Sequence, residues 1–110
     1  MKGELPIPGP CCRDAKSFEM IRAWVAEGGM HVAVNIGVWD RPDSNQSEPA
    51  AWGMLLADVA HHVANAIQKH KGTSQEVTLR EIEEFFLEEL KKPTTDHPGD
   101  FYIEKPKDGP

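Results

Sequence analysis

The alternation of apolar and polar residues predicts a β-hairpin in residues 18–39. Folding the chain at Gly28-Gly29 places apolar residues opposite one another on one face: Val25 with Val32, Ala23 with Val34, and Ile21 with Ile36. The apolar residues before Gly28 also have helical spacing, with this glycine as a C-cap. We favour the hairpin, because the pairing turns every apolar side chain of both strands toward the same face.

A long amphipathic helix is predicted after the turn-forming loop of residues 40–49. Apolar residues recur at i, i+3, i+4 and i+7 between Trp52 and Ile67, which is the pattern of a helix with one buried face. Ser47 is expected to cap the first turn, and Gly72 is expected to end the helix.

A second helix is expected to begin at Thr78, which forms a T-x-x-E capping box with Glu81, and to end before Pro93. Its apolar stripe consists of Leu79, Ile82, Phe86 and Leu90. These elements together predict an α+β fold. We expect a two-layer sandwich, in which an antiparallel hairpin-based sheet is covered on one face by the two α-helices.

Prolines are concentrated toward the two ends of the chain. We therefore expect a Pro-rich N-terminal segment over residues 1–16 and a Pro-rich tail over residues 93–110. The tail contains a short expected edge strand at 101–104. The part between them, residues 17–92, is expected to form a single α+β domain.

The charge balance narrows the classes of partner. Twelve basic residues against eighteen acidic ones give a net charge of −6. An acidic protein is poorly suited to bind nucleic acid or an anionic membrane surface. No apolar run approaches the roughly 20 residues of a membrane span, and the N-terminus lacks the apolar core of a signal peptide. We expect a cytoplasmic protein with reduced thiols at the adjacent Cys11 and Cys12, and no metal site.

The outer face of the hairpin is the main candidate site. If the valines and isoleucines lie under the helices, the opposite face carries Arg22, Trp24, His31, Asn35 and Trp39. Tryptophan and arginine are typical of protein interfaces, so we predict binding of an unidentified protein partner or self-association here. Two alternatives remain. The N-terminal segment or the tail covers this face as a second small core, or the face binds a small ligand.

A second, polar candidate lies on the long predicted helix, at Asp58, His61, His62 and Asn65. Asp58 and His62 are four residues apart, so the carboxylate is within reach of the imidazole. An Asp that orients a His is half of a general-base arrangement. No nucleophile or third group accompanies the pair, and a solvent-exposed pair explains the pattern equally well. We therefore assign no catalytic residue, metal ligand or cofactor.

Three stretches, RAWVAEGG, the GVW that follows the valine-rich strand, and WGMLLADVAHHVANA, carry a family resemblance. Over roughly residues 4–70 the chain resembles a family of small bacterial proteins with a domain of unknown function. The resemblance implies a single bacterial cytosolic domain and brings no activity or cofactor with it. The sequence favours a non-enzymatic interaction or regulatory module. The alternative is a small enzyme or metal-binding protein that uses Asp58 and His62.

Overall fold

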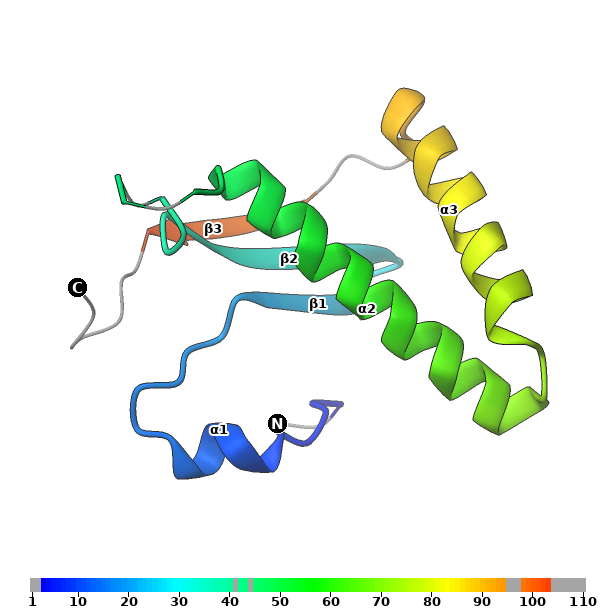
Figure 1. Ribbon diagram of the computed structural model, residues 1–110, viewed down its shortest axis with the longest axis horizontal. Helices are drawn as coiled ribbons and strands as arrows, with labels where there is room; N and C mark the ends of the chain where they lie inside the picture. The colour runs from blue at the N-terminus through cyan, green and yellow to red at the C-terminus, as the bar shows by residue number, and fades with distance from the viewer. Residues whose placement is uncertain (1–2, 41, 44, 95–97, 104–110) are drawn as a thin grey trace. The chain divides into compact units, whose positions relative to one another are not determined.

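The computed structural model describes residues 3–40, 42–43, 45–94 and 98–103. The chain divides into two compact units (Figure 1). The first consists of residues 1–41 together with 97–110 and contains a three-stranded sheet. The second, residues 42–96, contains two long helices. The α+β class is confirmed, whereas the covering of one sheet face by the helices stays a prediction.

A short helix, α1 (Gly9–Arg13), lies within the Pro-rich N-terminal segment. Proline stands in its first turn, where the missing N–H costs no helical hydrogen bond and the fixed φ suits the helix. The same property explains how a proline-rich segment contains a helical turn. Composition alone marks such a segment as loose.

Strands β1 (Ile21–Ala26) and β2 (Gly29–Ile36) form the predicted antiparallel hairpin. The two turn residues are Glu27 and Gly28, with φ of 51° and 79°, and not the predicted Gly28-Gly29 pair. Positive φ at both central residues is the requirement of a type I′ turn, the turn that best matches the twist of a hairpin. Gly29 is instead the first residue of β2, paired with Ala26.

The predicted pairing is consequently wrong by two residues. Ile21 pairs with Val34 and not with Ile36, and Trp24 pairs with His31 and not with Ala33. Side chains alternate between the faces of a strand with a period of two, so a shift of two residues leaves every side chain on its predicted face. The apolar pattern therefore grouped the side chains by face without fixing the register, and Ala23 and Val25 of the apolar face are exposed.

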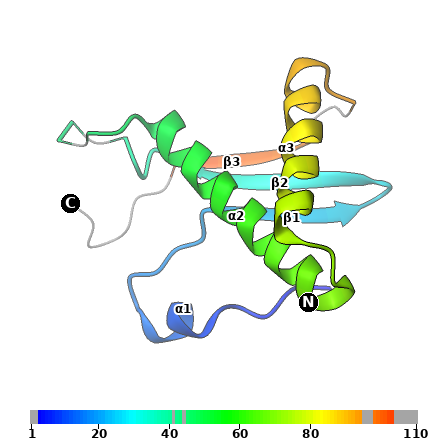
Figure 2. The same cartoon turned by 45° about the vertical axis from the view of Figure 1, so that its right-hand side comes forward.

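A third strand, β3 (Gly99–Ile103), lies on the other side of β2 and runs parallel to it (Figure 2). It overlaps the expected edge strand at 101–104, of which Glu104 lies outside the described residues. The sheet has the order β1-β2-β3 and is mixed, not purely antiparallel. Parallel neighbours need a long connection, and here both long helices lie between β2 and β3 along the chain.

Gly99 allows β3 to approach β2 closely. Its φ is 149°, and a Cβ at this position would overlap the carbonyl oxygen of Val32. The adjacent Val32 N–H donates a hydrogen bond to the carbonyl oxygen of Pro98, 3.2 Å away. Only glycine fits where the two backbones meet in this way.

Helix α2 (Glu48–Lys71) begins and ends at the predicted residues. The Ser47 hydroxyl accepts a hydrogen bond from the Ala50 N–H at 3.2 Å. At the other end Gly72 has φ of 81°, and its N–H donates to the Gln68 carbonyl at 2.8 Å. Both predicted caps are confirmed.

Helix α3 (Gln75–Lys91) begins earlier than predicted. Its N-cap is Ser74, whose hydroxyl accepts a hydrogen bond from the Val77 N–H at 3.1 Å. The predicted capping box at Thr78 is wrong, because Thr78 is a buried residue inside the helix. A sequence with two suitable hydroxyl residues four positions apart does not tell which of them caps the helix.

The two long helices contact each other and diverge from the loop that joins them. The Gln75 side-chain amide donates to Asn65 Oδ1 at 3.3 Å and to Gln68 Oε1 at 2.8 Å. Ala64 is completely buried, yet many larger apolar side chains of this unit are exposed: Met54, Leu56, Val59, Val63, Val77, Phe85, Phe86, Leu87 and Leu90.

In the described part of the chain, no helix combines the length and apolar composition needed to cross a bilayer.

Candidate functional site

An open cleft of about 900 Å³ lies between the N-terminal segment and strand β1. One wall is formed by residues 3–8 with Cys11 and Cys12, and the other by residues 17–19 and 21–25. Most of the lining surface is apolar. This volume is at the upper end of the range of about 300–1,000 Å³ that is usual for ligand sites. Both walls belong to the same compact unit.

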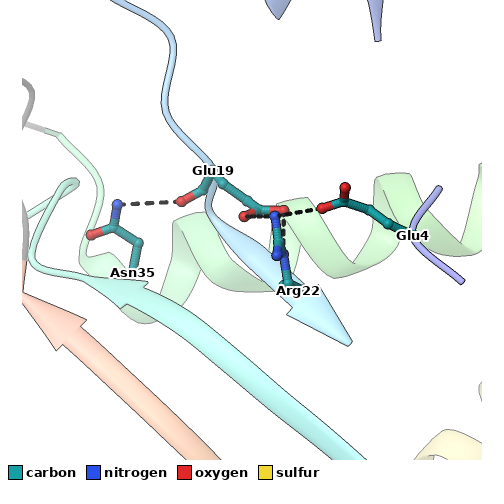
Figure 3. A network of polar contacts seen from close by, with 4 residues as sticks. All are labelled: Glu4, Glu19, Arg22 and Asn35. Carbon is teal, nitrogen blue, oxygen red and sulfur yellow. Dashed lines mark hydrogen bonds and ion pairs between the residues drawn. The ribbon is translucent and has the colours of Figure 1, made fainter. Parts of the chain in front are cut away.

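Arg22 carries the positive charge of the cleft and is held by two carboxylates (Figure 3). Its Nη2 lies 3.2 Å from Glu4 Oε2 and 3.0 Å from Glu19 Oε1. Its Nε also donates to Glu19 Oε2 at 3.1 Å, so Glu19 binds the guanidinium through two nitrogens. The hydrogen bond from Arg22 to Glu19, and the charge of that carboxylate, raise the pKa of Arg22 above its already high ordinary value.

These ion pairs attach the N-terminal segment to the sheet. Glu4 belongs to that segment, whereas Arg22 belongs to β1. The neighbouring Gly3 lies against the Trp24 ring, since a Cβ on Gly3 would be 3.5 Å from the ring. Trp24 itself is half-buried. The N-terminal segment therefore contacts the Arg22 and Trp24 side of the hairpin, whereas its covering of this face as a second small core stays a prediction.

Asn35 is buried and is hydrogen-bonded to the backbone just before β1 (Figure 3). Its Nδ2 donates to the Glu19 carbonyl at 3.3 Å, and its backbone N–H donates to the Met20 carbonyl at 3.0 Å. Its Oδ1 is buried and has no hydrogen-bond partner among the described residues. Asn35 thus fixes the chain just before β1, and with it the backbone that carries the Glu19 carboxylate.

The other predicted face residues do not line the cleft. His31 is half-buried, and its Nε2 lies 3.0 Å from the Ala26 carbonyl oxygen beside the hairpin turn. Trp39 is half-buried in the segment after β2. Of the five residues predicted for the hairpin face, the structure places only Arg22 and Trp24 at the cleft.

Sequence reasoning missed the residues of the opposite wall. Among them are Glu4 and the exposed apolar side chains Leu5 and Ile7. The one available signal was the apolar character of this short proline-rich stretch, which a merely loose segment does not need. Glu19 was also missed, although its position three residues before Arg22 is a common spacing for an ion pair.

The four residues of the polar candidate on α2 are not joined to one another by hydrogen bonds or ion pairs among the described residues. Asp58, His61 and His62 are exposed, and no hydrogen bond or ion pair joins them among the described residues. Asn65 instead accepts the hydrogen bond from Gln75. Within residues 3–40, 42–43, 45–94 and 98–103, no three His, Cys, Asp or Glu residues are grouped in a way that would hold a metal ion.

A comparison with the models of known protein families identifies the family of this chain. The model of a family described as "Domain of unknown function (DUF5076)" matches residues 4–94. The chain belongs to the DUF5076 family. The resemblance inferred from the sequence is confirmed, and the match also includes α3, which lies beyond the stretch that carried it. No curated protein matches this DUF5076 chain.

A solved structure from the photosynthetic bacterium Rhodopseudomonas palustrus CGA009 is similar to this DUF5076 chain. It is described as a "putative pyruvate dehydrogenase". The two chains are 29% identical, with a TM-score of 0.62, and the similarity covers 86% of this chain and 92% of the other. The shared fold therefore extends over nearly the whole of both chains.

Proposed function

We propose that this DUF5076 chain is a non-enzymatic interaction or regulatory module of the bacterial cytoplasm, and that it binds a protein partner in the cleft beside β1. The observation that carries the proposal is the open, mainly apolar cleft around a fixed arginine and a tryptophan. Leu5, Ile7, Phe18 and Val25 line it, with exposed fractions of 84%, 59%, 43% and 78%. Apolar side chains clustered at the surface are typical of a binding site.

Arg22 and Trp24 are the expected anchors of the interface. These residue types contribute most of the binding energy in many protein interfaces. Arg22 is held in one orientation by Glu4 and Glu19, so little side-chain freedom remains to be lost on binding. Trp24 is half-buried, its ring lies beside Gly3 of the N-terminal segment, and it is one of the residues that line the cleft.

The alternative of an enzyme or metal-binding protein has weaker support. Asp58 and His62 are both exposed, and no hydrogen bond or ion pair joins them among the described residues. The name of the similar structure suggests one activity to measure, the pyruvate-dependent reduction of an electron acceptor. Turnover that is lost in Asp58→Asn and His62→Gln would contradict the proposal.

Site-specific photo-crosslinking in the native cell tests the proposal. A crosslinking side chain at Leu5, in the cleft, is compared with one at Val77, an exposed apolar position on α3. We expect a distinct product from position 5 that is absent from position 77 and is lost when Trp24→Ala is added. Identical products from both positions, or a product that Trp24→Ala leaves unchanged, would remove the cleft as the binding site.

A further inference from the structure

Strand β1 lies at the edge of the sheet, and its hydrogen-bonding pattern can be assigned. The Asn35 N–H donates to the Met20 carbonyl, so this pair is a hydrogen-bonded pair of the antiparallel ladder. Such pairs recur at every second residue. Arg22 and Trp24 therefore direct their backbone N–H and C=O groups toward β2, opposite Ala33 and His31.

The intervening residues of β1 direct their backbone groups away from β2. These are Ile21, Ala23 and Val25, and among the described residues nothing is hydrogen-bonded to their N–H or C=O groups. All three residues line the cleft, whose other wall is the N-terminal segment. An unprotected edge of this kind is a template for pairing with another strand. Here the edge faces the cleft, and the N-terminal segment forms the opposite wall of that cleft.

Resting on the proposed function, we propose that the cleft binds an extended segment of a partner protein as an additional strand on β1. Backbone hydrogen bonds to Ile21, Ala23 and Val25 hold the segment, as in other cases of β-strand addition. The length of β1 sets the length of the paired segment at about five residues, or roughly 17 Å of extended chain.

The surroundings of the edge specify the chemistry of that segment. Side chains of an added strand alternate between the two faces of the sheet. On the face of Ile21, Ala23 and Val25 they meet apolar surface and are expected to be apolar. On the other face they meet the carboxylates of Glu4 and Glu19, whose two negative charges exceed the single charge of Arg22. A lysine or arginine is expected there, in keeping with the net charge of −6.

A second copy of the chain fits this site less well. It would bring its own Glu19 and Glu4 to the same face, adding negative charge to negative charge. Its β1 is also attached to β2, so a whole sheet would have to enter between β1 and the N-terminal segment. A single extended segment needs only the width of one strand, about 4.8 Å from its neighbour.

The test uses the full-length chain and a phage-displayed library of random peptides as the probe. Ala23→Pro removes an N–H group that points to the cleft and leaves the ladder to β2 intact. Ala23→Val is the matched control, because it keeps the N–H and also enlarges the side chain. We expect peptides that alternate apolar and basic residues. They should bind the wild type and Ala23→Val comparably, and Ala23→Pro at least about tenfold more weakly.

Two further measurements keep the test decisive if Ala23→Pro folds poorly. Bound peptide should slow hydrogen exchange at the Ile21, Ala23 and Val25 amides. A peptide that is N-methylated at the amides pointing toward β1 should not bind. A peptide that is N-methylated at the intervening amides should bind like the unmodified peptide. Peptides that bind in the cleft without either effect overturn strand addition and leave the proposed function standing. A library with no binder that depends on Trp24 contradicts both. A dimer that protects these amides without peptide overturns the proposal in favour of self-association.

Discussion

Arg22 on β1 lies 3.2 Å from Glu4 of the N-terminal segment. Glu19, just before the strand, holds the same guanidinium from another direction at 3.0 Å. The contact joins two stretches of chain that the backbone connects through residues 5–21, beside the contact of Gly3 with the Trp24 ring. The shape of the cleft is therefore expected to depend in part on the Arg22 side chain, and this dependence can be measured.

Replacing Glu4 by Gln should loosen the N-terminal segment without unfolding the sheet. The remaining contact of that segment with Trp24 is apolar, and exposed ion pairs contribute little to global stability. Limited proteolysis should cut residues 3–13 faster in Glu4→Gln than in the wild type, at an unchanged melting temperature. Glu76→Gln, which removes the exposed ion pair to Arg80 on α3, is the matched control and should leave that cleavage unchanged. Equal cleavage in all three proteins would mean that Glu4 does not hold the segment.

Replacing Glu27 by Asn should stabilise the hairpin. Glu27 has φ of 51°, a region that Asn adopts at lower cost, and Asn-Gly is the preferred pair of a type I′ turn. We expect a gain of about 0.5–1 kcal/mol in the free energy of unfolding, measured by urea denaturation. Glu27→Val should have the opposite effect, because a β-branched residue is poorly accommodated at positive φ. If the two substitutions changed stability in the same direction, the turn would not lie at Glu27-Gly28.

Replacing Gly99 by Ala should separate β3 from β2. The added methyl group would overlap the Val32 carbonyl oxygen, and the positive φ adds strain. Hydrogen exchange at the β2 amides that face β3, beginning with Val32, should become faster, whereas the amides of Ala33 and Asn35, which face β1, should change little.

Gly53 provides the control for that substitution. It lies inside α2, and a Cβ there would meet no atom within 4 Å. Gly53→Ala should therefore raise stability by roughly 0.5–1 kcal/mol through helix propensity alone. Faster exchange along β2 in Gly53→Ala as well would show that the effect of Gly99→Ala is not local to the strand pair.

Replacing Ser74 by Ala should destabilise α3 by about 1 kcal/mol, since its hydroxyl accepts the hydrogen bond from the Val77 N–H. Ser47→Ala should have a similar effect on α2, where the same bond is made with Ala50. Thermal unfolding followed by circular dichroism measures both. A negligible effect of Ser74→Ala would return the cap of α3 to Thr78, where the sequence pattern first placed it.

The hairpin shows which structural features could be predicted from the sequence and which could not. Alternation assigns Arg22 and Trp24 to one face and Ile21 to the other, because the period of a strand is two. It does not distinguish a turn at Glu27-Gly28 from one at Gly28-Gly29, since both keep the faces. The choice depends on backbone energies at positive φ and on the wider sheet, which a local pattern does not contain.

The candidate site was predictable only in part, for a related reason. Arg22 and Trp24 lie on a regular strand, so their side could be read from the sequence. Glu4 reaches Arg22 from an irregular segment, where no periodicity relates sequence position to direction. Asn35 was assigned to the outer face by the alternation of side chains along its strand, but hydrogen bonds to the backbone of residues 19 and 20 allow it to be buried.

The parallel pairing of β3 with β2 has a consequence for biosynthesis. Translation begins at the N-terminus, so the β1–β2 ribbon leaves the ribosome first, and both long helices follow before Gly99 is added. Until β3 has been synthesised, neither β1 nor β2 has a neighbouring strand on its outer edge. The nascent chain thus passes through a stage in which the backbone of β2 is as open to pairing as that of β1, and the arrival of the last five-residue strand closes only one of the two.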